Sequence, residues 1–203
     1  MTPTVQSEVE VANLALDILK EAPIVSMDES RTAARWMRRN FVPVRNLVTI
    51  AHVWKFAMDR AVLAEDAIPP EFDWKHRYRK PSDCLRVLPL RVGGTLDGRL
   101  ITHIVENDYI LTNASAPLYI RYLKAVPDVA EWPPTFVDAV AAKLASKCAH
   151  LLTGKQAMVE LATAQFQQSL QFAASIDSAE GTHAQQYATS YDDARYYYPA
   201  EEY

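Results

Sequence analysis

Five histidines and two cysteines are the side chains of this chain best suited to metal binding or nucleophilic chemistry. No His-x3-His, HExxH or Cys/His cluster with metal-ligand spacing occurs among His52, His76, His103, His150, His183, Cys84 and Cys148. Both cysteines stand in apolar stretches, which favour unreactive core thiols over nucleophiles. The sequence therefore predicts no metal site, and a structural or surface role for each histidine.

Loops that could hold a phosphate group are not found in the sequence either. The glycines form neither a GxGxxG pattern nor a P-loop; they are Gly93, Gly94, Gly98, Gly154 and Gly181. No GxSxG nucleophile elbow occurs. Because no motif supports catalysis or nucleotide binding, we expect no cofactor and a protein that is not an enzyme.

Arg31, Arg35, Arg38 and Arg39 are the strongest electrostatic feature of the sequence. At about 100° per residue they occupy one face of a predicted helix, in an arc of about 120° opposite an apolar stripe. Arg45 flanks them. A solvated helix face is one explanation, because arginine is common on protein surfaces. The alternatives are an interface for an acidic partner and, third, a phosphate contact.

The last part of the chain, residues 177–203, differs in composition from the rest. It contains no Leu, Ile, Val, Met, Phe or Trp, so it cannot form a core of its own. It holds six of the ten tyrosines: Tyr187, Tyr191, Tyr196, Tyr197, Tyr198 and Tyr203. Tyrosine offers a large contact area at a low entropic cost. We therefore predict an extended C-terminal tail that docks on a partner, with a solvated terminus as the alternative.

Hydrophobic periodicity predicts four helices, at about residues 7–21, 30–56, 134–153 and 155–175. Ser7 and Glu10 have the spacing of a capping box at the start of the first helix. Pro43 lies inside the second helical pattern, and an interior proline removes a hydrogen bond and clashes with the preceding turn. We therefore expect that helix to be kinked or broken at Pro43.

Short alternating stretches at about residues 84–125 predict a small antiparallel sheet, with turns at Gly93-Gly94, Asp97-Gly98 and Asn107-Asp108. Residues 57–83 are expected to form an irregular connection, because they are interrupted by Pro69, Pro70 and Pro81. The predicted fold class is mainly α. Residues 1–176 would form a helical bundle with a small inserted antiparallel β-sheet, and residues 177–203 an extended tail.

Overall charge and composition narrow the function classes. The chain has 203 residues and a formal net charge of −4, which argues against a dedicated nucleic-acid binder, since such domains are usually basic. Two distant cysteines indicate a reducing compartment rather than a disulfide framework. We expect no signal peptide and no membrane span, since the first ten residues carry no basic charge and no apolar run approaches about 18 residues.

Four stretches, taken in order, carry a family resemblance. The first is EVEVANLALDILKEAPIVSMDE at residues 8–29, and the second is a Trp-x-Phe-Ala signature formed by Trp54, Phe56 and Ala57. The third is YRKPSDCLR at residues 78–86, and the fourth is IRYLKAVPDVAEWPPTFVDAVAAKLA at residues 120–145. Over about residues 6–170 the chain resembles the tail tubular protein A family, the head-to-tail adaptors (connectors) of short-tailed bacteriophages.

This resemblance implies a structural protein of the virion. Twelve subunits would form a ring under the portal protein, C-terminal segments would reach onto the portal, and the tail nozzle protein would dock on the other side. Double-stranded DNA would pass through the lumen without specific binding when the genome is ejected. The protein would be made in the host cytoplasm and reside at the head–tail junction. The arginine face and the tail tyrosines would then be candidates for the subunit or portal interface.

Two other functions stay open. The chain could be a head-completion protein of a long-tailed phage or of a gene transfer agent. It could also be a small DNA-binding protein that uses the basic helix face, in which case its affinity for duplex DNA would depend on salt and on Arg35 and Arg38.

Overall fold

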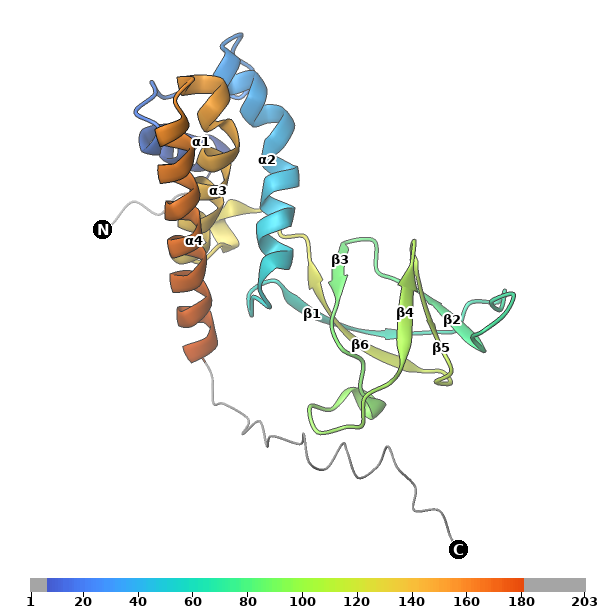
Figure 1. Ribbon diagram of the computed structural model, residues 1–203. Helices are drawn as coiled ribbons and strands as arrows, with labels where there is room; N and C mark the ends of the chain where they lie inside the picture. Colours follow the sequence, from blue (N-terminus) through green and yellow to red (C-terminus); the bar gives the residue numbers. More distant parts are fainter. Residues whose placement is uncertain (1–6, 181–203) are drawn as a thin grey trace, which may run out of the picture.

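The computed structural model describes residues 7–180 of the chain. The helices gather in one bundle and the strands in a second unit beside it (Figure 1). Within residues 7–180, 47% of the residues are helical and 18% are in strands, and the strands form two three-stranded antiparallel sheets. The prediction of a mainly α fold with one small inserted sheet is therefore wrong, and the protein is a mixture of α and β structure.

The bundle consists of α1 (Glu8–Ile18), α2 (Thr32–Ala51), α3 (Pro134–Thr153) and α4 (Gln156–Ala179). α3 packs against each of the other three helices, and half of its residues are buried. Several of these buried residues are alanines, whose small side chains allow the neighbouring helices to approach closely. Gly154, in the left-handed conformation, ends α3 and lets α4 turn back along it.

The start of α1 confirms the predicted capping box. The Ser7 hydroxyl accepts a hydrogen bond from the Glu10 backbone N–H at 3.2 Å, and the Glu10 carboxylate accepts one from the Ser7 N–H at 3.1 Å. The two side chains therefore satisfy two backbone donors that have no partner inside the helix. α1 ends at Ile18, before the predicted end at residue 21.

Pro43 lies within α2, which is one helix from Thr32 to Ala51. A break at the proline, one of the two expected outcomes, is therefore wrong. Pro43 is on the exposed side of the helix. The carbonyl of Arg39, which loses its usual helical partner, is thus on the side that faces water rather than the core.

α2 ends at Ala51, five residues before its predicted end, because His52 adopts an extended backbone conformation. This change of direction allows Trp54 to enter the core, where only 1% of it is exposed. Its indole N–H donates to the carbonyl of Val48 at 3.0 Å. The first residue of the Trp-x-Phe-Ala signature thus satisfies a carbonyl in the last turn of the helix before it.

Aromatic side chains form one cluster in the bundle core. Phe136 is at the centre, with ring centroids 5.1 Å from Trp54, 4.8 Å from Phe56 and 5.2 Å from Trp132, all three in edge-to-face contact. Phe41 of α2 stacks on Trp132 at 6.2 Å. Residues from α2, α3 and the two segments that lead to and from the β unit are therefore joined in one cluster.

The β unit contains two sheets. The first has the order β1 (Met58–Leu63), β6 (Leu118–Lys124), β3 (Cys84–Val87), and the second has the order β2 (His76–Arg79), β5 (Tyr109–Thr112), β4 (His103–Glu106). Asn107 has a positive φ in the turn between β4 and β5, where a turn was predicted. A turn was also predicted at Gly93-Gly94, where both glycines have positive φ and belong to the short 3-10 helix η1 (Val92–Gly94).

The prediction of an irregular connection at residues 57–83 is wrong, because β1 and β2 lie there. β1 pairs with the central strand β6 along its whole length, and β2 pairs with β5. Pro69 and Pro70 fall in the loop between the two strands and do not interrupt either of them. β1 forms by pairing with residues of β6 that are more than 40 positions away along the chain. A local sequence pattern does not reveal such a partner.

The two sheets enclose a second hydrophobic core, separate from that of the bundle. Its members come from both sheets and from the loop after β3: Tyr78, Leu90, Ile110, Leu118, Ile120 and Tyr122. Alternate residues of β6 point into it, as expected for a strand with one buried face. The buried Tyr78 satisfies its hydroxyl by donating to the Ala114 carbonyl at 2.8 Å.

The end of α4 is held against the start of the β unit by a group of three residues, which we call the Lys55–Asp177 clamp. One carboxylate oxygen of Asp177 accepts the Lys55 backbone N–H at 2.9 Å, and the other lies 3.1 Å from His52 Nε2. The Lys55 amine donates to the carbonyls of Asp177, Ser178 and Glu180. α4 therefore continues to Ala179, and residues 177–179 are helical although they were expected to belong to the extended tail.

Candidate functional site

The structure brings three of the four predicted arginines together and uses the fourth differently. Arg35, Arg38 and Arg39 line a hollow of about 270 Å³ beside the first half of α2. Arg31 instead donates to the carbonyls of Pro23 at 2.6 Å and Ala22 at 3.1 Å, and so holds the loop between α1 and α2. All four side chains are exposed.

We call the hollow lined by Thr32, Arg35, Arg38, Arg39 and Leu151 the arginine hollow. Its apolar wall is Leu151 of α3, which is 54% exposed. Arg38 lies 3.3 Å from the Asp28 carboxylate, and Arg39 donates to the Arg35 carbonyl. Among residues 7–180, the guanidinium of Arg35 makes no hydrogen bond or ion pair. The hollow therefore has the chemistry of a site for a carboxylate or a phosphate group next to an apolar or aromatic side chain.

Arg45, predicted to flank the arginine face, is not part of the hollow. Its side chain is buried and donates to the Asn46 side chain at 3.0 Å. Burial lowers the pKa of its guanidinium, and the Glu8 carboxylate opposes this shift. The helical spacing did carry a signal that the prediction missed, because Arg45 lies one turn from the buried Phe41 and Val48 and so shares their side of the helix.

The six tail tyrosines, Tyr187, Tyr191, Tyr196, Tyr197, Tyr198 and Tyr203, lie outside the residues that the structure describes. What the structure does define is the point from which that segment starts. This point lies next to the Lys55–Asp177 clamp, where α2 ends and β1 begins.

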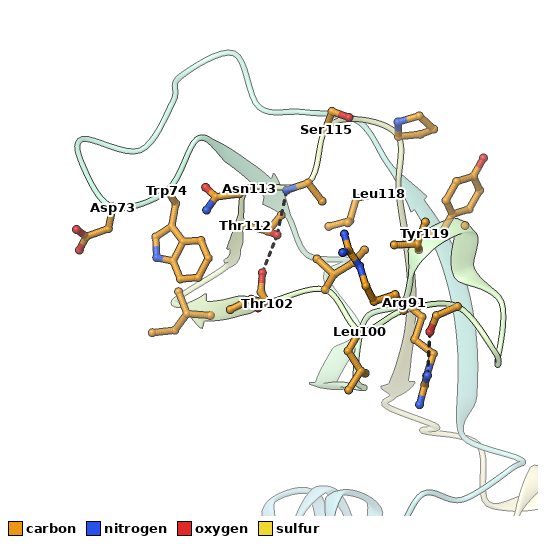
Figure 2. Close-up of a pocket in the computed structure, with 18 of the residues that line it drawn as sticks. Asp73, Trp74, Arg91, Leu100, Thr102, Thr112, Asn113, Ser115, Leu118 and Tyr119 are labelled. Atoms are coloured by element: carbon orange, nitrogen blue, oxygen red, sulfur yellow. Dashed lines mark hydrogen bonds between the residues drawn. The ribbon is translucent and has the colours of Figure 1, made fainter. Parts of the chain in front are cut away.

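A second, larger hollow of about 1640 Å³ lies on the β unit and was not predicted from the sequence (Figure 2). Trp74 and Thr102 lie toward one side of it and Arg91 and Tyr119 toward the other. Leu100 and Ile104 add exposed apolar surface, at 56% and 43%. No local pattern marks these residues as a group, because they come from four segments that only the packing of the two sheets brings together.

The polar groups of this second hollow are largely committed to the fold. The Thr112 hydroxyl donates to the Thr102 carbonyl at 2.8 Å, and the Asn113 side chain accepts the Lys75 N–H at 3.0 Å. The Arg91 guanidinium donates to the Gly98 carbonyl at 2.9 Å. The hollow therefore presents a broad concave surface with apolar and charged rim residues, which suits contact with another protein.

Both cysteine thiols are shielded by burial, Cys148 completely and Cys84 in part. Cys148 is fully buried in the bundle, and burial raises the pKa of its thiol to about 12. Burial is also the main cause of the raised pKa of Cys84. The reactive thiolate form is therefore disfavoured at both positions.

This gives a direct test by thiol labelling. With Ellman's reagent at pH 8, we expect Cys148 of the native protein to react at least about a hundredfold more slowly than after unfolding, because reaction needs a thiolate that water can reach. Cys84 should also be slowed, but less. The Cys148→Ala variant assigns the two rates. Rapid labelling of both thiols in the folded protein would contradict the buried position of Cys148.

Within residues 7–180, no group of three or more His, Cys, Asp or Glu side chains could hold a metal ion. None of the helices in this range combines the length and the apolar character needed to cross a bilayer.

Neither a scan against protein-family models nor a search of curated proteins found a match to this chain.

Proposed function

We propose that the chain is a ring subunit of the head-to-tail adaptor of a bacteriophage virion, which joins the portal protein to the tail nozzle protein. A subunit of a cyclic ring needs two different surfaces, because each copy contacts its neighbours through unlike patches. The observation that carries this proposal is that the bundle has two chemically distinct surfaces on separate helices. One is the arginine hollow of α2, and the other is the outer side of α4.

The outer side of α4 is unusual for an exposed helix. No charged residue occurs between Glu160 and Asp177, yet Leu161, Phe172 and Ile176 are exposed along this stretch. Solvated helices normally carry charges on the outer side, so an uncharged exposed side of about four turns suits packing against another protein. In Figure 1, α4 and α2 lie on different flanks of the bundle, which suits contacts with two different neighbours.

The stretches that resemble the adaptor family have clear structural roles, and this also supports the proposal. Trp54, Phe56 and Trp132 form the aromatic cluster around Phe136, and Tyr78 is fully buried in the β core. The net charge of −4 suits a channel through which DNA slides, since a net acidic wall repels phosphates. Under this proposal the protein is a dodecameric, non-enzymatic component of the head–tail junction.

The solution mass, measured by light scattering with and without the portal protein of the same phage, tests the proposal. We expect a monomer alone and a ring-sized complex with the portal, because the portal would template the ring. A stable free ring would also support the ring assignment, with subunit contacts as the driving force.

A monomer that forms no complex with the portal would overturn the proposal. If such a monomer bound duplex DNA at low salt and lost affinity as salt increased, the arginine hollow would belong to a small DNA-binding protein. Assembly with a long-tailed phage portal would instead favour a head-completion protein.

A further inference from the structure

The place from which residues 181–203 start is fixed by the Lys55–Asp177 clamp. Asp177 is 8% exposed and accepts the Lys55 backbone N–H, and the Lys55 amine donates to three carbonyls of the last turn of α4. A lysine in this position satisfies carbonyls that have no helical partner and interacts favourably with the helix dipole. The chain after Glu180 therefore leaves from the end of the bundle where α2 finishes.

The arginine hollow lies beside the other half of α2, within reach of that segment. From Arg39 to His52 the helix rises about 20 Å, at about 1.5 Å per residue. From Glu180 to Asp192 an extended chain spans up to about 40 Å, at about 3.3 Å per residue. The acidic part of the segment can therefore reach the hollow of the same molecule.

The chemistry of the segment complements that of the hollow. Residues 187–203 carry six tyrosines and four carboxylates, Asp192, Asp193, Glu201 and Glu202, against Arg195 alone. Guanidinium groups pair with carboxylates through two parallel hydrogen bonds and also stack on tyrosine rings. Leu151 supplies exposed apolar surface in the same hollow for a ring to cover.

The existing partner of the arginines is weak enough to be replaced. The Asp28 side chain is 83% exposed and meets Arg38 through one contact at 3.3 Å. Exposed pairs of this kind contribute little to stability. Within residues 7–180, the guanidinium of Arg35 has no hydrogen-bond or ion-pair partner.

We propose that residues 187–203 dock on the arginine hollow of their own chain, with Asp192 and Asp193 facing Arg35 and Arg38. A segment tethered within reach has an effective concentration in the millimolar range, so a modest set of contacts is enough to hold it. The free protein thereby covers its most cationic surface. The contact is made within one molecule, so it can be measured without the portal, although it uses one of the two surfaces proposed for the ring.

Chymotrypsin tests this in the full-length protein, because it cleaves after aromatic residues and the segment has six tyrosines. We expect slow cleavage within residues 187–203 of the native chain. The Arg35→Glu/Arg38→Glu variant should be cleaved at least about tenfold faster, because charge-assisted contacts are lost. High salt should have the same effect. Arg60→Glu/Arg79→Glu, the same double charge change at two exposed arginines of β1 and β2, should leave the rate unchanged and serves as the matched control.

Charge reversal on the segment side completes the test. Asp192→Arg/Asp193→Arg should also accelerate cleavage, and combining it with Arg35→Glu/Arg38→Glu should restore protection to within about twofold of the native chain. Unchanged urea midpoints would show that all variants remain folded.

Equal cleavage rates in the native chain and the arginine variant would overturn the proposal. Protection that increases with protein concentration, together with a larger solution mass, would also overturn it by placing the segment on a second copy. Neither result depends on binding to the portal, which is measured separately.

Discussion

Replacing Phe136 by alanine is expected to lower the free energy of unfolding by about 3–5 kcal/mol. Phe136 is 1% exposed and touches three aromatic rings, those of Trp54, Phe56 and Trp132. The substitution removes a large apolar surface and leaves a cavity that rigid neighbouring rings cannot close. Three edge-to-face contacts, each worth about 0.5–1.5 kcal/mol beyond the buried area, are lost as well.

The measurement is urea unfolding followed by tryptophan fluorescence, since two of the affected rings are indoles. Phe72→Ala is the matched control, because Phe72 is 77% exposed in the loop between β1 and β2. A surface change of this kind should stay within about 0.5 kcal/mol. Domains are typically stable by only about 5–15 kcal/mol, so the Phe136 variant should be close to unfolding at moderate temperature. Similar losses for both variants would contradict the central position of Phe136.

The second large effect is expected at Asp177. Asp177→Ala should lower the free energy of unfolding by about 1–3 kcal/mol, since the Lys55 backbone N–H loses its acceptor in a partly buried hydrogen bond. The same change removes the contact with His52 Nε2. The last turn of α4 is then held only through the Lys55 amine, so its amide hydrogens should exchange faster than those of the rest of the helix.

Two variants separate this effect from a simple loss of charge. Asp177→Asn keeps an oxygen for the Lys55 N–H and should recover part of the stability. Glu160→Ala removes an exposed acid from the same helix and should be nearly neutral. Urea unfolding gives the free energies, and hydrogen exchange locates the opening. If Asp177→Ala is as stable as Glu160→Ala, the clamp does not hold the end of α4.

The clamp also connects stability with the proposed role of the C-terminal segment. It fixes the position of Glu180, from which residues 181–203 start. In the free protein we expect the arginine hollow to be covered by the chain's own segment. In a ring, a neighbouring subunit or the portal would compete for the same arginines. Assembly would then release the C-terminal segment from the arginine hollow, and the segment could contact another protein.

Local sequence signals were sufficient for the four helices. The capping box at Ser7 and Glu10, the proline at the start of α3 and Gly154 at its end all mark helix ends through their own backbone chemistry. The turn at Asn107-Asp108 was predictable for the same reason. Such signals need only a few neighbouring residues, which is why they can be read without knowing the fold.

Local sequence signals did not predict all the strands of the β unit. β1 and β2 carry no strong pattern, and they form because β6 and β5 supply hydrogen-bond partners and a shared core. A short strand has few backbone bonds of its own, so its pairing depends on residues distant in sequence. For this reason the sequence suggested a mainly α fold and the tertiary structure does not have one.

The candidate site was also predicted only in part from the sequence. The sequence by itself placed four arginines on one helix face and gathered tyrosines and carboxylates in the last residues, because residue type and helical spacing are local properties. Only the tertiary structure decided that Arg31 holds a loop, that Arg45 is buried, and that Leu151 is exposed beside Arg35. These outcomes depend on how α1 and α3 pack against α2, and packing between elements joins residues that no spacing along the chain relates.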